Sequence, residues 1–233
     1  MVIGTSTLAV VTVGGIEIWI TETMVNTWII MLVLTALSLI VNRSLKKYRD
    51  IPHGFQNVIE AIVEAFDIFV RSTAGDKLYQ IGNWYFMVFS FIILCNLLGV
   101  FGLRSPTADW SMTFACALGT FAMILSNGFK FRKGEYIKTF FEPNFLFLPL
   151  NIIGELSRPV SLSFRLFGNV LSGTIIITLI YAIAPVVLQL FLPAALHVYF
   201  DLVMGSIQAY IFCVLSFSFV GAAAAAGSES GDA

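Results

Sequence analysis

The chain has 233 residues, of which 58% are hydrophobic and only 12% are charged, and its mean hydropathy is +0.89. Soluble domains carry about 25% charged residues, so these values exclude a soluble globular protein and predict an integral membrane protein. The formal net charge is −1, and the basic residues fall in separate loops, not in one patch. That distribution argues against nucleic-acid binding.

Five apolar segments are long enough to cross a bilayer as helices, because a span needs roughly 20 such residues. They are 24–47, 82–103, 109–128, 144–184 and 188–226. A helix over 145–181 would be about 55 Å long and one over 189–225 similar, against roughly 30 Å of hydrocarbon. We therefore expect these two to be strongly tilted and to form a hairpin. The predicted fold class is all-α and polytopic, with residues 1–233 in a single membrane domain.

Two further elements are expected outside the spans. Residues 1–23 form an external N-terminal segment, in which Gly14-Gly15 between β-branched runs suggests a short hairpin over 10–21. Residues 52–73 place apolar side chains at 3–4 spacing opposite acidic ones, which predicts an amphipathic helix along the cytoplasmic surface. The alternative for this segment is a soluble helix packed on a partner.

Basic residues predict the orientation in the membrane. They follow the first span as Arg43, Lys46, Lys47 and Arg49, and the third span as Lys130, Arg132, Lys133 and Lys138. Loops rich in lysine and arginine remain on the cytoplasmic side. We therefore expect the N-terminus outside and, after five crossings, the C-terminus in the cytoplasm.

One arginine lies where a membrane helix tolerates charge poorly. Arg165 falls in the middle of segment 144–184, within the stretch LSRPVSLSFRLFGNVLSG (156–173). A guanidinium stays protonated at any accessible pH, and a charge at the bilayer centre costs roughly 2.5–3.5 kcal/mol on insertion scales. No acidic residue of the chain is an obvious permanent partner. We expect an ion-carrying carboxylate on another subunit to compensate the charge; the alternative is a purely structural role.

Two amides are expected beside this guanidinium. If the last two segments turn near Pro185, Gln208 lies level with Arg165, while Asn169 follows Arg165 by one turn on the same face. An amide carbonyl accepts from a guanidinium without neutralising it, which leaves the charge available to an outside carboxylate. A turn at Pro193 instead would shift the level pairs by several residues and weaken this prediction.

Other polar residues lie on both sides of this level: Asp201, Ser172, Thr174 and His197 toward the outer side, and Glu155 and Ser161 toward the cytoplasm. Polar residues inside a bilayer normally line water or a proton route. The pattern predicts two offset half-channels that Arg165 separates.

Simpler interpretations of these residues stay open. Glu155 could pair with Arg158 at i,i+3 spacing, and the serines could be small packing residues between helices. His197 could relay protons, pair with Asp201 or face the interface. Asp201 is the hardest to explain structurally, because hydrophobic residues flank it deep in an apolar segment.

The stretch 156–173, Asp201 and the run IQAYIF (207–212) together resemble subunit a of the bacterial F-type rotary ATP synthases, the stator of their membrane sector. The resemblance covers most of the chain. It implies that Arg165 is the family's essential arginine, Asn169 the asparagine four residues later and Gln208 the glutamine of the final helix. Carboxylates on a rotating ring of c subunits would then meet Arg165, release their ion to one half-channel and be reloaded from the other.

The resemblance also implies partners and a location. The expected partners are the c-subunit ring, the b subunits of the peripheral stalk and the rest of the complex, in the bacterial inner membrane. We expect no cofactor and no bound metal, and no catalytic activity of the chain alone.

The chain departs from one common pattern of that family. Thr174 stands where relatives often have glutamate or histidine, and Asp201 where histidine or glutamate is common. We predict that Asp201 alone supplies the titratable group of the outer half-channel. Proton coupling is the default, and sodium coupling stays open.

Two other classes of function fit the sequence less well. A secondary transporter could bind an anionic substrate at Arg165, but inverted repeats and glycine-broken helices are not evident. An intramembrane hydrolase could use His197 with Ser206, but no paired nucleophile motif supports it.

Overall fold

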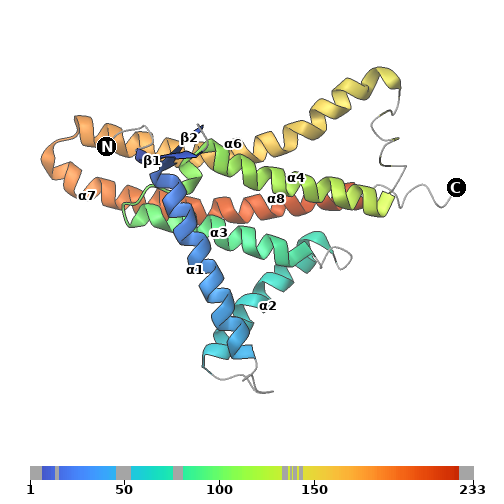
Figure 1. Cartoon of the computed structure of the whole chain (residues 1–233), viewed down its shortest axis with the longest axis horizontal. Coiled ribbons are helices and arrows are strands. Elements are labelled where there is room, and N and C mark those ends of the chain that lie inside the picture. The colour runs from blue at the N-terminus through green and yellow to red at the C-terminus, as the bar shows by residue number, and fades with distance from the viewer. Residues whose placement is uncertain are drawn as a thin grey trace.

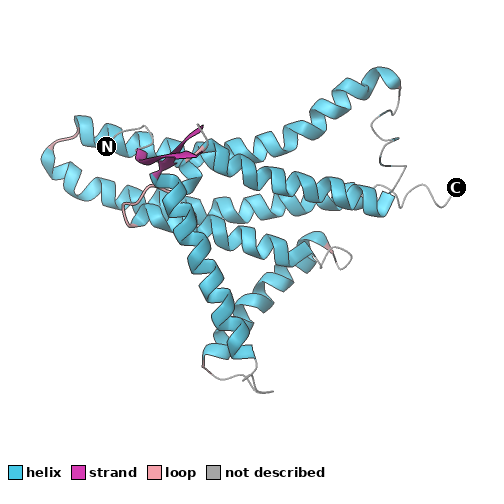
Figure 2. Cartoon of the chain, in the orientation of Figure 1, coloured by secondary structure: helices cyan, strands magenta, loops and turns pink. Residues whose placement is uncertain are grey.

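The computed structural model describes residues 7–13, 16–45, 54–75, 81–132, 136, 138, 141 and 144–225. Predictions on Gly14-Gly15, Lys46, Lys47, Arg49, Pro52, His53, Lys133 and residue 226 lie outside this part of the chain. Within it, helices dominate and one small antiparallel hairpin is present (Figure 2). The predicted all-α, polytopic fold class is confirmed, with five helices long and apolar enough to cross a membrane among the described residues.

The N-terminal hairpin pairs β1 (Thr7–Val13) with β2 (Ile16–Thr21), and Val10 lies opposite Trp19 in its register. β-branched and aromatic residues favour such strands. Leu8, Val10 and Trp19 are all exposed, so the hairpin has an uncovered apolar surface. The chain continues from β2 directly into α1 (Glu22–Leu45), the first predicted span.

The amphipathic segment forms α2 (Phe55–Ala74). Its carboxyl-terminal half buries Phe66 and Val70, whereas Phe55, Val58 and Ile62 at the other end are exposed. Gly75, at φ 75°, ends the helix and donates its N–H to the Arg71 carbonyl, a backbone angle that glycine adopts without strain. Figure 1 shows α1 leading away from the other helices and α2 returning toward them.

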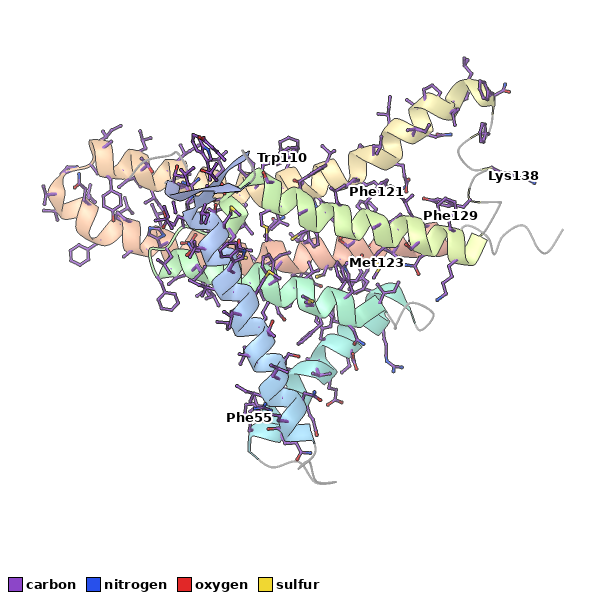
Figure 3. The ribbon with its side chains drawn as sticks, viewed as in Figure 1. Phe55, Trp110, Phe121, Met123, Phe129 and Lys138 are labelled. Carbon is purple, nitrogen blue, oxygen red and sulfur yellow. The ribbon has the colours of Figure 1, made fainter. Side chains whose placement is uncertain are left out.

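Four helices make up the packed bundle: α3 (Gly82–Val100), α4 (Trp110–Arg132), α6 (Leu148–Ile183) and α8 (Gly205–Ala225). α4 packs on both α6 and α8, and α3 packs on α8; Figure 3 shows the side chains between these helices, with Trp110 and Phe129 at opposite ends of α4. In membranes close packing holds helices together and small residues allow their approach. Gly119 illustrates this, because a Cβ there would lie 3.0 Å from the Trp84 ring.

The bundle core has two apolar clusters. One includes Phe66 and Val70 of α2, with Tyr85 and Phe217 of the bundle. The other joins Ile30 of α1 to buried residues of α3, α4, α6 and α8. α1 and α2 are therefore anchored to different parts of the bundle. Two short 3-10 turns, η2 (Pro106–Ala108) and η3 (Phe145–Phe147), precede α4 and α6.

The last two predicted segments form the expected hairpin. α6 has 36 residues, ends at Ile183, and is followed after Ala184 and Pro185 by α7 (Val186–His197). The Gln189 side-chain amide donates to the Ala184 carbonyl at 2.7 Å and so holds the turn. Because α7 continues through Pro193, the predicted turn near Pro185 is confirmed and the alternative at Pro193 is wrong.

The final segment differs from the single regular helix that the sequence predicts. A π-helix, η4 (Val198–Met204), separates α7 from α8. Such wide turns are rare and occur frequently at functional sites. Asp201 lies within η4, so the one acid of this segment belongs to the irregular part of the helix.

Candidate functional site

Arg165 lies on an uncovered face of α6. Its side chain is exposed and forms no hydrogen bond or ion pair with any other described residue. The same face presents Ser161 and Ser172, both exposed, and a Cβ atom added at Gly168 would meet nothing within 4 Å. The opposite face is buried through Pro159, Leu162, Ser163, Leu166, Gly173 and Ile177. Small residues therefore flank the arginine on a surface that another helix could approach closely.

The hairpin register places Gln208 at the level that the sequence predicts. A Cβ on Gly173 would lie 3.0 Å from Cγ of Phe200, so the neighbouring residues Ser172 and Asp201 are also nearly level. Continuing inward along both helices brings Arg165 to the level of Gln208. Gln208 is buried and its Nε2 atom has no hydrogen-bond partner, and no hydrogen bond joins it to Arg165.

Toward the hairpin turn, on the side of Arg165 that the sequence predicts to be outer, Asp201 pairs with His197. His197 Nδ1 and Asp201 Oδ2 are 2.8 Å apart, at i,i+4 spacing, and the two side chains are 25% and 16% exposed. Of the three roles left open for His197, the structure shows the pairing with Asp201. A carboxylate next to an imidazole is a pair that can hold and exchange a proton.

The Asp201 carboxyl group also contacts α3. A Cβ added at Gly99 would lie 2.5 Å from Cγ and Oδ2 of Asp201 and 2.8 Å from Oδ1. One turn farther inward the contact is reversed: the Asn96 amide donates to the Gly205 carbonyl at 3.1 Å, and a Cβ on Gly205 would lie 2.8 Å from the Asn96 Cβ. On each of the two elements, a glycine leaves room for a polar side chain of the other element.

Sequence reasoning missed the polar network around Asn96. The Thr107 hydroxyl donates to Asn96 Oδ1 at 3.1 Å, and Ser105 hydrogen-bonds both Thr107 and the Cys95 carbonyl. All three side chains are buried. The signal for this network was Asn96 itself, a polar residue that interrupts the hydrophobic stretch of α3.

On the inner side, Glu155 is held by two donors. Arg158 Nη1 lies 3.0 Å and Tyr136 Oη 3.1 Å from the same oxygen, Oε1. The Arg158 guanidinium also lies 5.3 Å from the centre of the Phe219 ring, within cation–π range. The predicted pairing of Glu155 with Arg158 is present, and Tyr136 is a partner that the sequence gave no means of finding.

Two of the hydroxyl groups predicted to line the ion pathway, those of Thr174 and Ser172, donate to backbone carbonyls of their own helix. Thr174 donates to the Val170 carbonyl at 2.9 Å, and Ser172 to the Asn169 carbonyl at 2.9 Å. Such bonds to the preceding turn satisfy a hydroxyl within its own helix. Ser163, one of the serines interpreted as packing residues, is buried and joins α6 to α4 through a hydrogen bond of 3.2 Å with Thr113.

The sequence model described as ATP synthase A chain matches residues 24–221. The chain belongs to this family. The match begins within the first turn of α1 and ends at residue 221, in the last turns of α8, so it contains Arg165, Asp201 and Glu155.

Curated relatives agree with this assignment. ATP synthase subunit a 2 of Acaryochloris marina is 39% identical over 86% of the chain and 84% of its own length. ATP synthase subunit a of Moorella thermoacetica is 34% identical, over 89% and 91% respectively. ATP synthase subunit a, sodium ion specific, of Propionigenium modestum is 31% identical over 86% of the chain and 73% of its own length. The chain is thus similar to multi-pass membrane subunits of bacterial ATP synthases.

Proposed function

We propose that this chain is the ion-translocating stator of a rotary ATP synthase, in which Arg165 separates two offset half-channels. The observation that carries the proposal is the state of Arg165. It is exposed on α6 and makes no bond to another described residue, although a charge at the bilayer centre is costly without a partner. A carboxylate that passes this face on a ring of c subunits supplies the missing counter-charge.

The two acids of the hairpin define where the half-channels lie. Glu155 precedes Arg165 by ten residues, which is about 15 Å along the helix. Asp201 is level with Ser172, about 10 Å beyond Arg165 in the other direction. Neither acid is close enough along the axis to neutralise the arginine. The two sites are thus separated by a fixed positive charge, as offset access from opposite sides of the membrane requires.

Arg165 acts on the ring by electrostatics. A carboxylate beside a fixed cation favours its ionised form, so a loaded carboxylate releases its ion when it reaches the arginine. The emptied carboxylate is reloaded from the outer half-channel through Asp201 and His197. Asn169 lies one turn from Arg165 and Gln208 lies level with it, but neither amide bonds the guanidinium in the chain alone. The donors of Arg165 are therefore available to the ring carboxylate.

We propose that the chain lies in the bacterial inner membrane with its N-terminus outside and its C-terminus in the cytoplasm. Membership of the family supports the location, and the two basic loops support the orientation. The b subunits of the peripheral stalk are the second partner in this proposal. They would contact α1, whose residues Leu32, Val33, Leu37, Leu39 and Ile40 are all exposed. Figure 1 shows this helix leading away from the bundle.

We propose the proton as the transported ion. The outer acid is hydrogen-bonded to an imidazole at 2.8 Å, which suits proton exchange. ATP-driven uptake into vesicles, with sodium and proton varied independently, distinguishes the two ions; sodium-dependent pumping at constant pH would contradict this part of the proposal.

The Arg165→Ala variant tests the function itself. In the assembled complex we expect loss of ATP-driven pumping and of ATP synthesis, while the soluble sector still hydrolyses ATP. Arg43→Ala, which removes an exposed arginine at the end of α1, is the matched control and should pump normally. Coupled pumping by Arg165→Ala would overturn the proposed function.

A further inference from the structure

Gly99 of α3 lies directly against the carboxyl group of Asp201. It is buried on α3, and a Cβ atom there would fall within 2.5–2.8 Å of three atoms of the Asp201 carboxyl group. Real Cβ atoms do not approach other heavy atoms so closely, so the present carboxyl position is compatible only with glycine at 99. The carboxyl group occupies the space that a side chain on α3 would fill.

His197 bonds the same carboxyl group. Oδ2, one of the atoms nearest to Gly99, is also the atom 2.8 Å from His197 Nδ1. Asp201 is therefore held between the backbone of α3 and an imidazole of its own helix. A movement of the carboxyl group away from α3 would therefore also change the length and angle of its hydrogen bond with His197.

The contact one turn farther inward fixes the register of the two helices. The Asn96 amide donates to the Gly205 carbonyl and accepts from Thr107, so both ends of the amide are engaged. Gly205 has no room for a side chain beside Asn96. This second contact keeps η4 and α3 aligned, so a clash at Gly99 cannot be relieved easily by sliding the hairpin.

We propose that Gly99 is a positioning residue for ion transfer, which admits the Asp201 carboxyl group against α3 and so holds it at His197. This inference rests on the proposed function, in which Asp201 loads the ring. In this inference the outer site is formed by two elements in contact, α3 and the π-helix η4. Gly99 acts through Asp201 and does not itself touch the ion.

The first experiment is Gly99→Ala in the complete ATP synthase. A displacement of about 1 Å at a reacting group can cost about a hundredfold in rate, and we expect ion-driven ATP synthesis to fall by at least about tenfold. The chain should still be recovered in the complex, with ATP hydrolysis retained. Gly119→Ala is the matched control, because it places the same methyl group in another close helix contact, 3.0 Å from Trp84; we expect it to retain synthesis.

A second pair of variants distinguishes positioning from packing. Asp201→Ala removes the carboxyl group, and the double variant Gly99→Asp, Asp201→Ala supplies one from α3, close to the original position. We expect the double variant to recover ion-driven synthesis by at least about fivefold over Asp201→Ala alone, because a proton-transferring group works wherever it is within reach of the proton. A packing role alone predicts no recovery.

The outcomes separate this inference from the proposed function. Normal synthesis by Gly99→Ala, or no recovery in the double variant, overturns the role of Gly99 while leaving Arg165 untouched. If Arg165→Ala pumps normally, the proposed function fails first, whatever the glycine variants do. Loss of synthesis in Gly99→Ala with recovery in the double variant supports the positioning role.

Discussion

The two acids on either side of Arg165 are each paired with a basic residue, but the two basic residues differ in kind. Glu155 and Asp201 each bond a basic residue of their own hairpin, at 3.0 Å and 2.8 Å. The base beside Glu155 is Arg158, which keeps its charge at any accessible pH. The base beside Asp201 is His197, and an imidazole exchanges its proton near neutral pH.

This difference suggests different tasks. Arg158 and Tyr136 both donate to the same oxygen of Glu155, so the inner acid is held in place by two donors. Asp201 has a partner that can share a proton with it. We infer that the outer acid transfers ions while the inner acid shapes the field along the inner half-channel.

The largest effect is expected from the charge that separates the two acids. Arg165→Lys retains a positive charge but replaces the planar, five-donor fork by a compact ammonium. We expect ATP-driven pumping to fall to less than about a tenth of normal, because a misplaced donor loses interactions made only at the transfer step. Quenching of a pH-sensitive dye in inverted vesicles measures this. Near-normal pumping would show that charge alone suffices.

Asp201→Asn should have the next largest effect. The amide keeps the size of the side chain and can still hydrogen-bond His197, but it cannot take up a proton. We expect ion-driven ATP synthesis to drop about tenfold or more, since positioned proton-transfer groups contribute about 10²–10⁴. Recovery of the chain in the purified complex is the control for assembly. Full synthesis would show that the outer half-channel needs no acid here.

Glu155→Gln should cost less, about two- to threefold in synthesis, because a glutamine carbonyl still accepts from Arg158 and Tyr136. Comparing its synthesis rate with that of Asp201→Asn in the same membranes tests the contrast between the two acids directly. An equal or greater loss in Glu155→Gln would reverse the ranking and place proton transfer on the inner acid.

Thr174→Ala should have the smallest effect, within about twofold of normal, because the hydroxyl bonds the Val170 carbonyl of its own helix and contributes little to a route. Synthesis measured with sodium present and absent checks this. A large loss that depends on sodium would assign Thr174 to an ion-binding site and contradict proton coupling.

Much of the fold could be predicted because membrane helices are defined by length and hydropathy. The hairpin turn near Pro185 and the two very long segments followed from the absence of any other polar break. The prediction that Arg165 and Gln208 lie at the same height in the hairpin followed from that turn, and the contact between Gly173 and Phe200 agrees with it. Arg165 and Asp201 were visible as charges in apolar surroundings.

The rest depended on contacts between distant segments. Nothing in the local sequence indicates the π-helix at 198–204, which changes the face that the following residues present. Gly99 is one glycine among many until Asp201 is placed against it, and Tyr136 lies 19 residues before Glu155, so no helical spacing connects the two. The predicted bond between Arg165 and Gln208 is absent in the chain alone, and residue spacing could specify their level but not their contact.

The most direct test of the central claim is passive proton conductance through a membrane sector whose ring cannot turn. Vesicles would contain the membrane sector without the soluble sector, with the c ring cross-linked to the stator, and a potassium diffusion potential would drive protons. With Arg165 present we predict no conductance above that of empty vesicles, and with Arg165→Ala a steady leak between the half-channels. Equal tightness of both, or a leak in both, would contradict the claim that this arginine separates them.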